Sequence, residues 1–255
     1  MSASGGDPLD LASLRSAVGR LPYPPLFVTV SGAHLYGFPS PDSDIDLRGV
    51  YVLPIAAVVG LKAPDDTVER TFEHGGREVD LVAHDICKFL RLLLNKNGYV
   101  LEQLYSPLVV EGGGAFEELR SLGRECISRH VYHHYAGFAR NQIKLLEREA
   151  PPRAKTLLYV YRVLLTGIWL LRTGEVEANL LRLNESFRLP FIPDLIAQKQ
   201  QELSALDAGS LELHQATIAR LQAELDTAFE ESKLPEAATN WPALNDFLVR
   251  VRLER

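Results

Sequence analysis

The chain has 255 residues, of which 46% are hydrophobic and 24% are charged, and this composition is typical of a globular protein with a substantial core. No apolar run reaches the roughly 18 residues of a membrane span, and the N-terminus lacks the basic-then-apolar pattern of a secretory signal. We therefore expect a cytoplasmic protein without a membrane partner. Two cysteines, Cys87 and Cys126, are too few for a disulfide framework or a cysteine metal cluster.

The net charge of −6 is unevenly distributed along the chain. Residues 1–119 carry 9 Lys and Arg against 16 Asp and Glu, a balance of −7, whereas residues 120–190 carry 12 against 6, a balance of +6. Residues 191–255 carry 6 against 11, a balance of −5. A basic segment beside an acidic one suits a protein that binds a polyanion next to a cation site. Solvated helix faces would give the same asymmetry, so both interpretations stay open.

The N-terminal part alternates between apolar runs and turn-forming residues. Apolar positions at helical spacing predict a helix over 8–21, and the β-branched run 27–30 predicts a buried strand. A polar loop leads to a second strand over 44–53. Two alternating runs on either side of Gly75-Gly76 predict a β-hairpin over 67–83, because this dipeptide favours tight hairpin turns.

Three carboxylates fall on neighbouring strands of this predicted sheet. Side chains alternate between the faces of a strand, so Asp44, Asp46 and Arg48 share one face. Two adjacent carboxylates repel each other unless a cation lies between them. Asp80, on the second strand of the hairpin, adds a third carboxylate. The set predicts a site for a hard cation, Mg²⁺ or Mn²⁺, with room for substrate phosphates.

The rest of the chain is predicted to be helical. Asp85 is a good N-cap for a helix over 85–94, and Gly112-Gly113-Gly114 forms a joint at which we place a domain boundary, giving domains 1–111 and 112–255. Apolar spacing predicts further helices over 100–104, 116–123, 126–149, 154–173, 176–183, 195–206, 211–231 and 241–252, with 190–193 as a linker. The apolar stripe of the last helices could pack within this chain or against a second copy, so an oligomer is open.

The helix predicted over 154–173 carries one polar stripe on a largely apolar surface. Lys155, Tyr159, Arg162 and Thr166 lie at i, i+4, i+7 and i+11. A cation on a buried face needs a partner of opposite charge. Substrate phosphates or the acidic metal site could be this partner, and an ion pair across the domain interface is an equally good alternative at this level. For Glu102, in the helix predicted over 100–104, we expect a structural pair or a helix-end contact and no catalytic role.

The motif residues together resemble a known family. Gly32, Gly37, the run Ser43-Asp44-Ile45-Asp46 and the later Asp80 are similar to the signature of the DNA polymerase β-type nucleotidyltransferase superfamily. The fuller string GAHLYGFPSPDSDIDLRGVYV resembles a narrower branch, the RlaP-like predicted nucleotidyltransferases linked to RNA repair. The resemblance covers about the first two thirds of the chain, in patches.

This resemblance implies an α+β fold, with a palm-like mixed sheet and flanking helices followed by an α-helical domain. It also implies an enzyme that moves a nucleoside monophosphate from a nucleoside triphosphate, such as ATP, to an acceptor hydroxyl, here an RNA 3′ end like that of a tRNA. Asp44, Asp46 and Asp80 would be the metal ligands and catalytic residues. The nucleotide would be bound by Ser31, Gly32, Ser43, Lys155, Tyr159 and Arg162.

One position departs from the superfamily pattern. The serine that usually follows the first glycine is replaced by Ala33, and the neighbouring hydroxyl lies before the glycine, at Ser31. Either Ser31 and main-chain N–H groups hold the β- and γ-phosphates, or phosphate binding is weakened. The alternatives to RNA as acceptor are a protein or a small molecule. A non-catalytic module that binds RNA or nucleotide is the third possibility.

Overall fold

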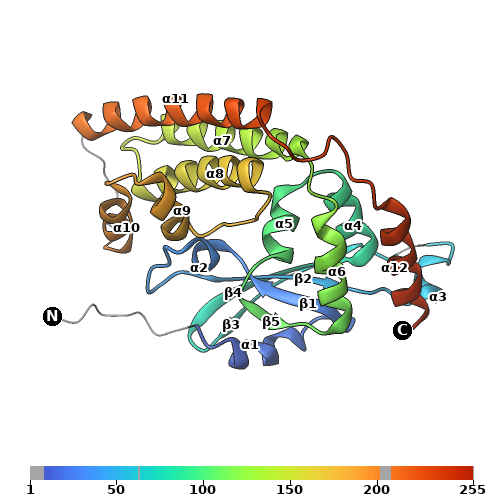
Figure 1. Ribbon diagram of the computed structural model, residues 1–255. Helices are drawn as coiled ribbons and strands as arrows, with labels where there is room; N and C mark the ends of the chain where they lie inside the picture. The colour runs from blue at the N-terminus through green and yellow to red at the C-terminus, as the bar shows by residue number, and fades with distance from the viewer. Residues whose placement is uncertain (1–8, 63, 202–207, 255) are drawn as a thin grey trace.

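The computed structural model describes residues 9–62, 64–201 and 208–254 (Figure 1). These residues form a five-stranded mixed sheet with helices on both faces, and a further layer of helices is stacked beyond one of those faces. The expected α+β class is confirmed: a mixed sheet with flanking helices is followed by an α-helical part.

The sheet places the predicted carboxylate strands side by side. Its strands are β1 (Pro25–Val30), β2 (Ile45–Tyr51), β3 (Thr67–His74), β4 (Arg77–Asp85) and β5 (Val109–Glu111), in the spatial order β3-β4-β2-β1-β5. β2 and β4 are parallel, and the other neighbouring pairs are antiparallel. The expected hairpin joins β3 to β4 through Gly75 and Gly76, whose φ angles of 60° and 77° favour glycine. Because β3 turns back into β4, β4 runs beside β2 in the same direction.

Helix α1 (Leu11–Val18) covers one face of the sheet. It begins at Asp10, whose carboxylate accepts hydrogen bonds from the main-chain N–H groups of Ala12 and Ser13 at 3.0 and 3.1 Å. Its buried side chains pack in one cluster with β-strand residues that include Ile45 and Leu47. Since neighbouring residues point to opposite faces, Asp46 and Arg48 are directed to the other side of the sheet.

The opposite face is covered by α4 (Ile86–Leu94), α5 (Gly98–Leu104) and α6 (Gly114–Arg124). Asp85 caps α4 as expected, accepting from the N–H of Cys87 at 2.9 Å. The C-terminal helix α12 (Trp241–Leu253) returns to this side and packs on α4 and α6. Two short helices, α2 (Gly32–Tyr36) and α3 (Ile55–Val58), follow β1 and β2.

The outer layer is built around α8 (Ala154–Thr173). This helix packs against α7 (Tyr132–Arg148), α9 (Leu180–Phe187), α10 (Ile192–Gln200) and α11 (Ala208–Glu230). By length and composition alone α8 could cross a membrane, but 83% of its most apolar window is buried within the protein. Such burial is typical of a helix in the core of a folded protein.

The hydrophobic core runs without a break from the sheet into the outer layer. Phe27 of β1 stacks on Phe116 of α6 with ring centroids 4.6 Å apart. One cluster of buried side chains contains both of these residues, together with most of α8. The boundary after residue 111 remains a prediction about folding units, and residues on both sides of it share this core.

Candidate active site

Helix α2 begins directly beside the carboxylate of Asp46. The N–H of Ser31 donates to the main-chain oxygen of Asp46 at 2.8 Å, which brings the end of β1 and the start of β2 together. Gly32 follows with φ of +60°, and a Cβ at this position would lie 1.8 Å from Asp46 Oδ2. Only glycine therefore allows the Asp46 carboxylate to lie against the first turn of α2.

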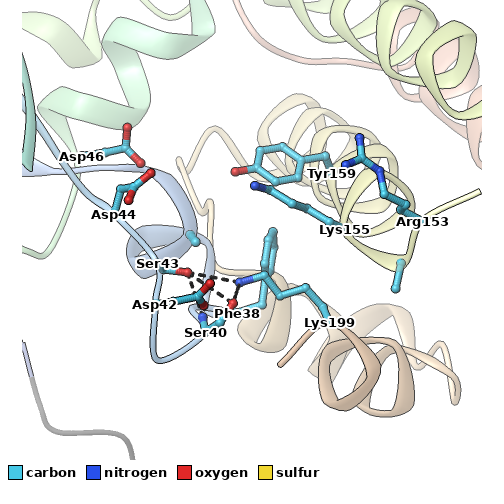
Figure 2. A pocket seen from close by; sticks show the side chains of 12 residues that line it. Phe38, Ser40, Asp42, Ser43, Asp44, Asp46, Arg153, Lys155, Tyr159 and Lys199 are labelled. Atoms are coloured by element: carbon cyan, nitrogen blue, oxygen red, sulfur yellow. Dashed lines mark hydrogen bonds between the residues drawn. The ribbon is translucent and has the colours of Figure 1, made fainter. Parts of the chain in front are cut away.

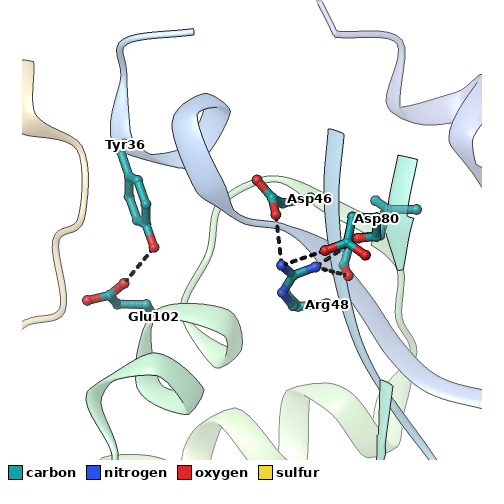
Figure 3. Close-up of polar contacts among 6 residues, drawn as sticks. Tyr36, Asp46, Arg48, Asp80 and Glu102 are labelled. Atoms are coloured by element: carbon teal, nitrogen blue, oxygen red, sulfur yellow. Dashed lines mark hydrogen bonds and ion pairs between the residues drawn. The ribbon is translucent and has the colours of Figure 1, made fainter. Parts of the chain in front are cut away.

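Asp46 and Asp80 lie opposite each other in the parallel register of β2 and β4. Arg48 lies between their side chains (Figure 3). Its Nη2 donates to Asp46 Oδ1 at 2.7 Å and to Asp80 Oδ2 at 3.3 Å, and its Nη1 donates to the main-chain oxygen of Asp80 at 2.8 Å. The third carboxylate thus lies on the same face of the sheet as Asp46, with a guanidinium between the two.

The electrostatics of this cluster are unfavourable for a charged Asp46. Burial raises the pKa of its carboxyl, Arg48 lowers it, and the negative charges of Asp80 and Asp44 raise it again, so that it lies above the usual value. Among the described residues, no three His, Cys, Asp or Glu side chains are arranged as a ready-made metal site. A cation would therefore be held by fewer than three carboxylates or after Arg48 moves.

A cavity of about 400 Å³ opens next to these carboxylates (Figure 2). One wall comes from α2, the loop after it and the start of β2, and the other comes from the outer helical layer. The first wall is formed by Ala33, Phe38, Ser40, Asp42, Ser43, Asp44 and Asp46, and the second by Arg153, Ala154, Lys155, Tyr159 and Lys199. Acidic side chains thus face basic ones across a space that suits a small-molecule ligand.

Five of the predicted site residues line this cavity: Asp44, Asp46, Ser43, Lys155 and Tyr159. The ammonium of Lys155 and the hydroxyl of Tyr159 extend from α8 toward Asp44 and Asp46 (Figure 2). Burial raises the pKa of the Tyr159 phenol above its ordinary value, so the hydroxyl keeps its proton at neutral pH.

The other predicted residues do not line the cavity. Gly32 lies beneath Asp46, and Asp80 lies one strand away from it, beyond Arg48. Ser31 is only 7% exposed, and its hydroxyl lies against the phenol of Tyr36. The hydroxyl of Ser31 is therefore not positioned to replace the one that Ala33 lacks.

The prediction that Arg162 binds nucleotide is wrong for this structure, because its side chain is completely buried. Its Nη1 donates to Glu102 Oε1 at 2.7 Å, and both side chains are almost inaccessible to solvent, 0% and 2% exposed. Tyr36 (Figure 3) donates to the same carboxylate at 3.4 Å, and Tyr135 donates to it at 3.2 Å. Arg162 thus forms the ion-pair alternative, with Glu102 in the role of structural partner.

Two basic residues of the cavity wall, Lys199 and Arg153, were not predicted from the sequence. Lys199 of α10 donates to the hydroxyl of Ser43 at 3.2 Å and to that of Ser40. Arg153 precedes α8 and is paired with Glu149 at 2.6 Å. Lys199 and Arg153 carry no local signal, because the chain brings them to the cavity through the packing of α8 and α10.

The carboxylate of Asp46 lies beside Gly32 at the start of α2, and Asp44 and Asp46 face Lys155 of α8 across a cavity. This arrangement is typical of polymerase β-type nucleotidyltransferases. The chain belongs to the RlaP family, described as the RNA repair pathway DNA polymerase beta family, whose profile matches residues 10–250.

Two proteins and one solved structure are also similar to this chain. It is 34% identical over 155 residues to the uncharacterized protein MJ0002 of Methanocaldococcus jannaschii, covering 61% of this chain and 63% of that protein. It is 29% identical over 153 residues to the uncharacterized protein YcgL of Bacillus subtilis, covering 59% of this chain and 58% of that protein. Each match thus spans less than two thirds of the relative. A crystal structure of a nucleotidyltransferase-like protein from Exiguobacterium sibiricum 255-15 has 15% identity and a TM-score of 0.35, over 96% of this chain and 80% of that chain.

Proposed function

We propose that this protein is a metal-dependent nucleotidyltransferase that moves a nucleoside monophosphate from a nucleoside triphosphate to the 3′ end of an RNA. The observation that carries the proposal is the cavity with Asp44 and Asp46 on one wall and Lys155 on the other. Carboxylates suit a cation that bridges to phosphate, and a lysine suits the phosphates themselves. Membership of the RlaP family supports the same reaction class.

The donor set fits Mg²⁺ or Mn²⁺. Magnesium is usually bound by one or two carboxylates together with waters and substrate phosphates, and two of the three carboxylates that line this cavity, Asp44 and Asp46, belong to the acidic motif. Burial is the main cause of the raised pKa of the Asp46 carboxyl, and the charges of Asp80 and Asp44 add to it, so a bound cation would favour the ionised form. Asp44 and Asp46 would hold the ion, with Asp80 as a further ligand once Arg48 releases it. When bound, the ion would neutralise phosphate charge and polarise the α-phosphorus.

The reaction forms a bond between the acceptor oxygen and the α-phosphorus and breaks the bond from that phosphorus to the bridging oxygen. Pyrophosphate leaves with the electron pair. Asp80 is the proposed acceptor of the proton from the attacking hydroxyl. Lys155 would offset the charge that develops on pyrophosphate, while the hydroxyls of Ser43 and Tyr159 would orient the substrate.

The experiment is transfer of label from α-³²P-labelled nucleoside triphosphates to RNA in the presence of Mg²⁺. We expect the wild type to label the RNA, and Asp44→Ala and Asp46→Ala to lose this activity. Asp246→Ala is the matched control, because Asp246 is an exposed carboxylate of α12. Equal labelling by the wild type and both site variants would reject the proposal. Label on protein instead of RNA would identify a different acceptor, and nucleotide binding without pyrophosphate release would identify a binding module.

A further inference from the structure

The loop that follows α2 carries two serine hydroxyls on the same cavity wall as Ala33. Ala33 lines the cavity together with Ser40 and Ser43. The N–H of Ser40 donates to the Ser43 hydroxyl at 2.8 Å, and the two hydroxyl oxygens are 3.4 Å apart. Two hydroxyl groups are therefore fixed side by side on the wall that carries Asp44.

Lys199 closes this part of the cavity from the outer helical layer (Figure 2). Its ammonium donates to the hydroxyls of Ser40 and Ser43. The next residue, Gln200, donates from its side chain to the main-chain oxygen of Pro39 at 3.1 Å. The end of α10 is thus attached to a loop about 160 residues earlier in the chain, so the ammonium is held at a defined place in the cavity.

The ammonium of Lys199 has no direct ion-pair partner. In the part of the chain that the structure describes, no carboxylate lies within ion-pair distance of Lys199 or of Lys155. Burial lowers the pKa of Lys199, and the positive charge of Lys155 lowers it too, while the negative charge of Asp42 raises it. Because neither lysine is paired directly with a carboxylate, both ammonium groups are available to an anion that enters the cavity.

We propose that Lys199, Ser40 and Ser43 form the binding site for the polyphosphate tail of the nucleotide, with Lys155 beside it. Lysine has three N–H donors, two of which go to the serine hydroxyls, and the Ser43 hydroxyl donates its own hydrogen to Ser40 Oγ, so that the Ser40 hydroxyl keeps its hydrogen for donation. The group can thus offer one ammonium N–H and the Ser40 hydroxyl to the β- and γ-phosphates, which Ala33 cannot. This inference rests on the proposed function and specifies its substrate as a nucleoside triphosphate recognised through its tail.

The test is calorimetric titration of the full chain with Mg²⁺ and two ligands, α,β-methylene ATP and AMP. We expect Lys199→Met to weaken binding of the triphosphate about tenfold to a hundredfold, the effect of losing charged hydrogen bonds, and to change AMP binding less than about threefold. The double variant Ser40→Ala/Ser43→Ala should show the same selectivity to a smaller extent. Lys233→Met, which changes an exposed lysine, is the control and should bind as the wild type does.

Each outcome decides the inference. Unchanged triphosphate binding by Lys199→Met and by the serine variant would overturn it while leaving nucleotidyl transfer intact. Equal loss of both ligands would also overturn it, because Lys199 would then only hold the loop in place. If the wild type bound neither ligand, the proposed function would fall and this inference with it. The Lys199→Arg variant, which keeps the charge, should recover part of the triphosphate affinity.

Discussion

The carboxylate of Asp46 lies so close to the backbone of Gly32 that no side chain fits between them. A Cβ at position 32 would approach Oδ2 to 1.8 Å. The contact joins the first turn of α2 to the β-strand that carries the acidic motif. The glycine of this motif therefore has a steric role toward the carboxylate, in addition to any contact with phosphate.

Gly32→Ala should displace Asp46 and weaken Mg²⁺-dependent nucleotide binding by more than tenfold. Gly75→Ala is a matched control, because Gly75 has the same φ of +60° but open space around its Cβ position. The control should lose about 1 kcal/mol of unfolding free energy from backbone strain alone, and Gly32→Ala should lose more. Urea denaturation and calorimetric titration measure the two effects. Equal losses of stability and unchanged binding would show that Asp46 tolerates the methyl group.

Asp46→Asn should stabilise the metal-free protein at neutral pH. Burial, with the charges of Asp80 and Asp44, raises the folded-state pKa of Asp46 above its unfolded value despite Arg48. At pH values between the unfolded and the folded pKa, the folded state binds more protons at Asp46 than the unfolded state does. The stability therefore falls as pH rises through this window, and above the window the ionised carboxylate destabilises the fold. Asparagine has no ionised form, so Asp46→Asn removes the cost of the charged carboxylate. The stability gained by Asp46→Asn should shrink as pH is lowered below the unfolded pKa.

Urea denaturation in EDTA, repeated at several pH values, measures this difference. Asp44→Asn is the control, because Asp44 is exposed and its replacement should leave the stability nearly unchanged. Added Mg²⁺ should stabilise the wild type and not Asp46→Asn. A wild type more stable than Asp46→Asn in EDTA at neutral pH would show that the ion pair with Arg48 outweighs the burial.

Removing one partner of the Glu102–Arg162 pair should be far more harmful than removing both. Arg162→Met leaves the carboxylate of Glu102 buried without its cation, which typically costs about 3–5 kcal/mol. The double variant Glu102→Gln/Arg162→Met removes both charges and should recover most of that loss. The exposed pair Arg124–Glu175 is the control, and Arg124→Met should change the stability by less than about 1 kcal/mol. Urea denaturation of the two single variants and the double variant completes a double-mutant cycle. The account would be contradicted if the unfolding free energy lost by the double variant equalled the sum of the losses in Glu102→Gln and Arg162→Met.

Local patterns were sufficient to predict the acidic half of the site. Alternation along β2 placed Asp46 and Arg48 on one face, and the Gly75-Gly76 turn brought Asp80 onto a neighbouring strand. That Asp46 and Asp80 are register partners could not be predicted, because the pairing of β2 with β4 is set by long-range packing. The position of Arg48 between them follows from that register.

The basic half of the site depends on contacts between distant segments. A polar stripe on α8 is compatible with a cavity wall at Lys155 and with a buried ion pair at Arg162, and only the position of Glu102, 60 residues away, distinguishes them. The Pro190–Pro193 segment was expected to be a linker, yet α10 begins at Ile192 because proline is tolerated in the first turn of a helix. Helix α10 ends at Gln200, so Lys199 lies in its last turn, against the loop that contains Ser40.

Replacement of His134 should make the fold more resistant to acid. Burial, and secondarily the positive charge of Arg162, lower the pKa of His134 to about 4, and its Nε2 has no hydrogen-bond partner in the described part of the chain. Between pH 6.5 and about 4 the unfolded chain binds a proton at this histidine that the folded state does not, so stability falls as pH falls through this window. His134→Phe should flatten that part of the stability profile, whereas His133→Phe, at an exposed position of the same helix, should leave it unchanged. Urea midpoints measured between pH 4 and 7 test this, and parallel profiles for the wild type and His134→Phe would show that other groups cause the acid sensitivity.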